Sequence, residues 1–127
     1  MKTSLKIINF YDNLERISYK SKIDVLNPYI SPEVKKIYTA FYHKFFDDNN
    51  KRIILFGINP GRLGGGITGI PFTDPYNLKE KCGIDSNFDI KKELSSKFIY
   101  EMIILMVVFI YFIKNFLFQV FAHTDLY

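Results

Sequence analysis

The sequence predicts an α/β domain with a short parallel sheet. Three observations lead to this class: an amphipathic helix pattern after residue 31, a short apolar run at 52–58, and a glycine-rich loop directly after that run. Helix, loop, buried strand and glycine loop follow one another as they do in α/β proteins. With 127 residues, the chain is long enough for one domain with a single core.

The first two expected elements are helices. Residues 5–26 are expected to contain one helix, with Leu5, Ile8, Leu14 and Ile17 as candidate core positions. A second helix is expected to start at Ser31, which can act as N-cap, followed by Pro32 at the first helical position. Its apolar residues recur at helical spacing and predict one face on the core: Val34, Ile37, Tyr38, Phe41 and Phe45. The polar residues 47–50 are expected to end it.

The next expected elements are a strand and two helices. Residues 52–58 are apolar, partly β-branched and bounded by turn residues, which predicts a buried strand of a parallel sheet. Residues 77–81 are expected to form a helical turn, and a helix is expected over 93–102.

The loop from Phe56 to Phe72 is the most informative segment, because it places the polar side chain of Asn59 at the carboxyl end of the predicted strand. Ligands of open parallel sheets bind at this edge. Pro60 restricts the backbone of Asn59, and the glycines let a flat ligand or a sugar-phosphate approach the main chain. Phe72 offers an aromatic face for stacking. A flexible surface loop without a ligand is the alternative interpretation.

Common nucleotide motifs fit this loop poorly. Gly64 to Gly69 formally matches G-x-G-x-x-G, but Pro71 and Pro75 interrupt the helix that a dinucleotide fingerprint should open. The glycines are not followed by Gly-Lys-Ser/Thr, which excludes a P-loop.

Composition sets weaker limits. The net charge of +4 is compatible with a polyanionic partner. The single cysteine, Cys82, excludes an internal disulfide and a cysteine zinc site, and favours a reducing, intracellular compartment. The N-terminus lacks the apolar region of a secretory signal.

The loop resembles the first active-site motif of the uracil-DNA glycosylase superfamily, in particular its single-strand-selective monofunctional branch. The motif is Gly57-Ile-Asn-Pro-Gly61, followed by Gly64 and by Thr68-Gly-Ile-Pro-Phe72. A bacterial subgroup of that branch is similar over about residues 27–103, including Phe41-Tyr-His-Lys-Phe45, Phe72-Thr-Asp74, Glu80-Lys-Cys-Gly83 and Phe98-Ile-Tyr-Glu101. This resemblance implies part of a three-layer αβα glycosylase fold in residues 1–103, truncated in its C-terminal half.

The resemblance also implies roles for individual residues. Asn59 matches the asparagine that positions the water attacking C1′ of the deoxyribose, and Phe72 matches the aromatic that stacks on the flipped base. Ile58, Gly61 and Gly65 match positions that bind the pyrimidine. The expected partner is DNA with a single-stranded or flipped-out uracil. Positioning and charge stabilisation need no metal or organic cofactor. Gly65 and Ile67 depart from the larger or polar residues of the better-known branch, so the base preference stays open.

The family's second motif, a histidine before a proline-serine turn, is not found in its expected context. His43 lies in the aromatic helix, where a solvated or locally bonded role is expected, and His123 stands in Ala-His-Thr-Asp. The chain is therefore expected to hold half of a site and to be inactive or weakly active.

The tail at 104–127 has two main interpretations, beside that of an unrelated core helix. Residues 102–121 are apolar enough to resemble a membrane span, which would make a membrane-tethered nucleotide-binding protein the alternative function. The other is a one-nucleotide frameshift near codons 103–105. Regrouped codons can then read YGGVYLFYKKFFISSICPHGF without a stop, and this resembles the family's continuation. A bacterial cytoplasmic location is expected, with membrane association only if the tail is native. A third interpretation of the function is that the chain is a structural fragment without a ligand. The oligomeric state stays open.

Overall fold

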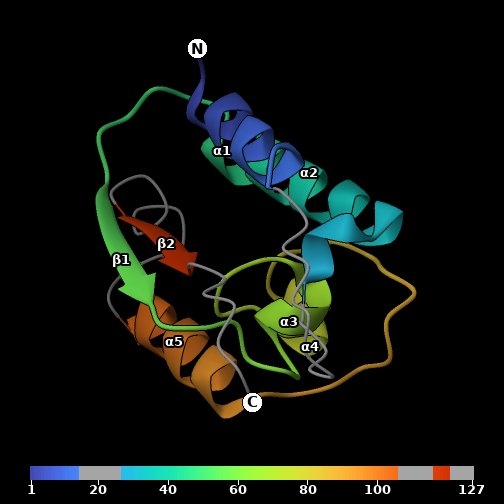
Figure 1. Cartoon of the computed structure of the whole chain (residues 1–127). Helices are drawn as coiled ribbons and strands as arrows, with labels where there is room; N and C mark the ends of the chain where they lie inside the picture. The colour runs from blue at the N-terminus through green and yellow to red at the C-terminus, as the bar shows by residue number, and fades with distance from the viewer. Residues whose placement is uncertain (15–26, 106–115, 121–127) are drawn as a thin grey trace.

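The computed structural model describes residues 1–14, 27–105 and 116–120 (Figure 1). The elements in this part of the chain are, in order, α1 (Thr3–Asp12), the 3₁₀ turn η1 (Pro28–Ile30), α2 (Pro32–Phe46), β1 (Ile53–Gly57), α3 (Gly65–Thr68), α4 (Pro75–Glu80), α5 (Leu94–Leu105) and β2 (Phe116–Val120). The predicted turn at 77–81 lies in α4, and the predicted helix at 93–102 is α5.

Helix α2 begins and ends where its sequence predicts. The side chain of Ser31 caps it by accepting a hydrogen bond from the Val34 N–H at 3.5 Å, and Pro32 is its first residue. Asp47 is its C-cap. The predicted face is buried except for Phe45, which is partly buried, because Tyr42 and Phe46 occupy the neighbouring core positions.

Helix α1 is placed differently from its prediction. Ile8 is buried as expected, but Leu5 is 40% exposed, and Ile7 and Tyr11 form the inner face instead. This face is set by the spacing of Ser4, Ile7, Ile8 and Tyr11 at i, i+3, i+4 and i+7, which turns Leu5 away from α2. Leu14 packs against the core from its edge. Ile17 lies outside the described residues.

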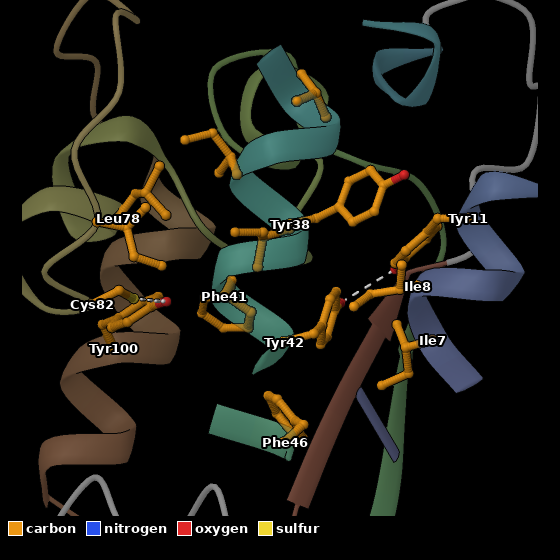
Figure 2. Packing of buried hydrophobic residues seen from close by; sticks show 14 residues of the cluster. Ile7, Ile8, Tyr11, Tyr38, Phe41, Tyr42, Phe46, Leu78, Cys82 and Tyr100 are labelled. Carbon is orange, nitrogen blue, oxygen red and sulfur yellow. Dashed lines mark hydrogen bonds between the residues drawn. The ribbon is translucent and has the colours of Figure 1, made fainter. Parts of the chain in front are cut away.

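The core is built around α2 (Figure 2). Ile7, Ile8 and Tyr11 of α1 pack on one side of this helix, and Leu78, Cys82 and Tyr100 pack on the other. Burial of the aromatic side chains supplies most of the apolar contact. The core therefore joins α1 to the segment that follows the glycine loop.

The connection from α2 to β1 is fixed by charges. Asp48 accepts two hydrogen bonds from the Arg52 guanidinium, both at 2.8 Å. Arg52 also lies over the Phe46 ring, with 4.8 Å between its Cζ and the ring centroid. A bidentate pair fixes direction as well as distance. The end of α2 and the start of β1 are thereby held together.

Strands β1 and β2 pair in parallel, from Ile53 opposite Phe116 to Gly57 opposite Val120. This pair and the surrounding helices agree with a partial glycosylase-like α/β fold, whereas the three-layer arrangement stays a prediction. The expected burial of the strand is wrong for β1, where Ile53 is 59% and Phe56 60% exposed. The helices pack mainly on one another through α2, so they leave the strand uncovered.

The predicted membrane span at 102–121 overlaps three different regions. Its first residues belong to α5, residues 116–120 form β2, and the remainder lies outside the described residues. Within the described ranges, no helix combines the length and the apolar character needed to cross a membrane.

Candidate active site

Asn59 lies two residues beyond the end of β1, in a bend that leads into Pro60. Its side chain is partly buried, whereas the neighbouring Ile58 is 79% exposed. The amide of Asn59 therefore stands at the carboxyl end of the parallel pair, where open α/β sheets bind their ligands. This is the place that the sequence predicted for it.

The second half of the loop is a buried turn and not a flexible surface loop. Residues Gly64–Gly66 and Thr68–Pro71 are all buried. The Thr68 hydroxyl donates to the Thr73 carbonyl at 2.7 Å and accepts from the Ile70 N–H at 3.1 Å. One threonine thus closes the turn from within, on either side of Pro71 and Phe72.

Further hydrogen bonds anchor this turn to α5. The hydroxyls of Thr73 and Tyr100 lie 2.8 Å apart, and the Tyr100 hydroxyl lies 3.1 Å from the Cys82 sulfur (Figure 2). All three groups are buried, and burial raises the pKa of the Cys82 thiol to about 11. Cys82 is therefore a neutral structural partner at neutral pH and not a nucleophile.

Phe72 has a backbone conformation that is rare for an aromatic residue. Its φ is 54°, and it is the only non-glycine residue with positive φ among those that the structure describes. Left-handed backbone costs about 1–2 kcal/mol for an L-residue and persists where the surroundings impose it. The hydrogen-bonded turn on both sides of Phe72 imposes it here. The backbone of this partly buried residue is thus held in one conformation next to the glycine loop.

Gly69 ends α3 and brings the loop against α2. Its φ is 73°, and a Cβ built there would lie 2.4 Å from Cγ1 of Val34. We expect Gly69→Ala to cost about 2–4 kcal/mol of unfolding free energy, from left-handed backbone and overpacking together. Gly83→Ala is the control: it has a similar φ of 63°, but its Cβ would meet only the Lys44 ammonium, at 3.2 Å, at the end of a long side chain. Urea denaturation compares the two, and equal losses would contradict the packing argument.

Two of the loop glycines face the Glu93 carboxylate. A Cβ built on Gly61 would lie 1.6 Å from Oε1 of Glu93, and a Cβ built on Gly64 would lie 1.9 Å from Oε2. The notch formed by Gly61 and Gly64 thus holds a carboxylate. An anion there repels phosphate, which argues against a nucleotide phosphate bound by these glycines. Gly65 differs, because its Cβ would lie 3.1 Å from the Ile70 carbonyl, within the turn.

Asp74 holds Glu93 beside the loop. This carboxylate is fully buried, and its two oxygens accept from different segments: Oδ1 from the Asn77 N–H at 2.7 Å and Oδ2 from the Glu93 N–H at 2.8 Å. Ser96 accepts hydrogen bonds from the Asp74 N–H and the Asn77 side chain, both at 3.0 Å. Asp74 therefore caps α4 and fixes the start of α5.

The sequence did not indicate Glu93 as a site residue, because it predicted only the start of a helix there. The available signal was the acidic residue at a helix start, which ordinarily indicates no more than favourable interaction with the helix dipole. Burial raises the pKa of the Glu93 carboxyl, a hydrogen bond with Ser95 lowers it, and the charge of Asp74 raises it. The net shift is upward.

The two histidines do not contribute to the site in the described part of the chain. His43 is exposed, with its Nδ1 3.7 Å from an oxygen of Asp47, as expected for a locally bonded histidine. His123 lies outside the described residues. In the ranges that the structure covers, no cluster of three or more His, Cys, Asp or Glu side chains could hold a metal ion.

Comparison with solved structures gives an informative match. No family model matches the sequence, and no curated protein matches it. Among solved structures, the chain is similar to wild-type SMUG2 of Pedobacter heparinus, with 38% sequence identity and a TM-score of 0.86. The match covers 94% of this chain and 53% of that chain, so this chain spans about half the length of the solved protein. It extends beyond residues 27–103, which make up a smaller share of the sequence.

Proposed function

Because this chain belongs to the uracil-DNA glycosylase superfamily, we propose that it binds DNA and hydrolyses the bond between uracil and deoxyribose. The observation that supports this function best is that one loop carries both Asn59, just beyond the end of β1, and Phe72, whose backbone is held at positive φ by a buried turn. An amide and an aromatic ring on a glycine loop suit a flipped base. Base excision repair, in the bacterial cytoplasm, is the corresponding process.

In the proposed mechanism, the Asn59 amide orients a water molecule toward C1′. The C1′–N1 bond breaks, its electron pair leaves with the base as a uracil anion, and the water oxygen bonds to the oxocarbenium-like sugar carbon. The water loses a proton to solvent in this step, and the uracil anion takes up a proton from solvent on release. An amide is a poor base, so Asn59 contributes by positioning. Phe72 stacks on the base, while Ile58, Gly61 and Gly65 line the pocket. No step in this scheme uses a metal or an organic cofactor.

We further propose that residues 1–103 form the N-terminal part of a three-layer glycosylase fold and that the tail at 104–127 results from a frameshift. The frameshift is supported by the regrouped reading, which resembles the family's continuation and places FFISS at the position of β2. Sequencing the coding DNA tests this directly, because a stop codon in the regrouped frame would exclude it.

The half-site is expected to support only weak base release. A single-stranded oligonucleotide with one uracil, incubated with excess protein, tests this activity. We expect Asn59→Ala to reduce the rate by about 10²-fold or more, as losses of one catalytic positioning group do. Asn87→Ala, an exposed asparagine away from the loop, is the matched control. Equal rates for the wild-type and Asn59→Ala chains would contradict the role of Asn59. The same oligonucleotide with thymine in place of uracil reports contaminating nuclease activity.

A further inference from the structure

The notch between Gly61 and Gly64 contains a carboxylate that has few partners. Among the described residues, the Glu93 side chain forms no salt bridge, and its hydrogen-bond partner is the exposed Ser95. A half-buried carboxylate can accept about four hydrogen bonds. Because a charged acceptor that loses water without gaining partners is unfavourable, the lone pairs of Glu93 that no described residue occupies are available to a donor group of a ligand.

The position of this carboxylate is fixed by its backbone. The Glu93 N–H is bound by the buried Asp74, and the Glu93 carbonyl accepts from the Lys97 N–H at 2.9 Å. Both contacts belong to the main chain, so they persist whatever side chain stands at 93. The carboxylate end of the side chain lies nearest to the two glycines, and the Glu93 Cβ would lie 3.7 Å from a Cβ built on Gly64.

The carboxylate also lies at the proposed base pocket. Its Oε1 occupies the space where a side chain at 61 would begin, and Gly61 follows Asn59 by two residues. Asp74, which holds the Glu93 backbone, follows Phe72 by two residues. The proposed water-positioning amide, the proposed stacking ring and Glu93 are therefore connected to one another by short stretches of chain and by one buried hydrogen bond.

The geometry points to Glu93 as a specificity-determining residue that accepts a hydrogen bond from a ring N–H of the flipped base. This inference rests on the proposed function and names the ligand class: bases with an imide N–H between two carbonyls, of which uracil is the simplest. The negative charge disfavours a phosphate in the notch and favours a donor edge. Glu93 thereby selects for the edge of the base, while Phe72 binds its face.

The test compares two probes, a labelled single-stranded oligonucleotide with uracil and the same oligonucleotide with N3-methyluracil, which lacks the ring N–H. Fluorescence anisotropy at pH 7.5 measures both affinities. We expect the wild-type chain to prefer uracil by about tenfold or more, the effect of one hydrogen bond to a charged group. No preference in the wild-type chain would overturn the inference.

Three variants separate hydrogen bonding from shape. Glu93→Gln keeps the size of the side chain but removes the charge, so the preference should fall several-fold; Glu93→Ala removes the acceptor and should abolish it. Glu101→Gln, an exposed carboxylate on the same helix, should leave the preference unchanged. If the N3-methyl group is rejected only by its bulk, Glu93→Gln will retain the full preference, and the inference is overturned.

The same data distinguish this inference from the proposed function. If Asn59→Ala impairs base release and the wild-type chain still prefers uracil, but Glu93→Gln and Glu93→Ala retain that preference, the role of Glu93 alone is wrong. If the wild-type chain binds the uracil and N3-methyluracil oligonucleotides equally and Asn59→Ala leaves base release unchanged, both are wrong. Circular dichroism of each variant confirms that it is folded before it is compared.

Discussion

Replacing Asp74 by alanine is expected to remove about 3 kcal/mol or more from the free energy of unfolding. The reason is that both oxygens of this fully buried carboxylate are in use, on the N–H groups of Asn77 and Glu93. Each buried donor left without a partner costs about 1–3 kcal/mol. The loss of the α4 cap is included in that sum. Urea denaturation followed by circular dichroism measures the change.

Two further variants define what the Asp74 result means. Asp89→Ala removes an exposed carboxylate from the connection between α4 and α5 and should leave stability within about 0.5 kcal/mol of the wild-type value. Asp74→Asn keeps one carbonyl acceptor and should give an intermediate loss. If Asp74→Ala unfolds at the same urea concentration as Asp89→Ala, the bridge between α4 and α5 contributes nothing to stability.

Replacing Asp74 should also change the conformation of the glycine loop. Asp74 connects the turn that holds Phe72 to the residue that fills the Gly61 notch, so its loss frees the Glu93 backbone. We expect proteolysis to reach the connection around residue 93 more readily in Asp74→Ala than in Asp89→Ala. The stability of the fold and the geometry of the candidate site thus depend on the same buried carboxylate.

Local signals predicted the helices and the loop well. The Ser31 cap and the Pro32 start of α2 depend on side chains adjacent in sequence, and the structure has both. The position of Asn59 after β1 follows from the change from an apolar run to proline and glycine. Such features are set by a few neighbouring residues, so a pattern along the chain is enough to place them.

Features that depend on distant residues were not predictable in this way. The glycines at 61 and 64 were interpreted as room for a ligand, whereas the structure places Glu93 there, some 30 residues later in the chain. The prediction that β1 is buried was also wrong. An apolar run shows that a strand can be covered by other elements, but not whether any element covers it. Likewise, Leu5 is exposed because the contact with α2 selects one face of α1 out of two similar ones.

The exposed apolar surface connects the fold to the proposed frameshift. β1 exposes Ile53 and Phe56, and α5 exposes Leu94, Phe98 and Leu105, with Leu94 at 85%. Large exposed apolar patches occur at interfaces or cause aggregation. We therefore expect the chain, when expressed alone, to bind a hydrophobic dye and to form polydisperse species in light scattering. A monodisperse monomer that melts cooperatively would contradict this expectation.

A protein expressed in the regrouped reading frame, which starts near codons 103–105, is expected to show the largest effect of all. If the frameshift is real, the restored protein continues as the family does and regains the imidazole that steadies the departing base. Stabilising that developing charge is worth about 10²–10³-fold in rate, so base release should be faster by at least this factor than in the 127-residue chain. The same change should cover β1 and reduce dye binding. Asn59→Ala in the restored protein should abolish most of the gained activity, which ties the gain to this site. A restored protein that is no more active and no less aggregated would show that the apolar tail is the native continuation, and the activity of the half-site would then have to be explained without a second motif.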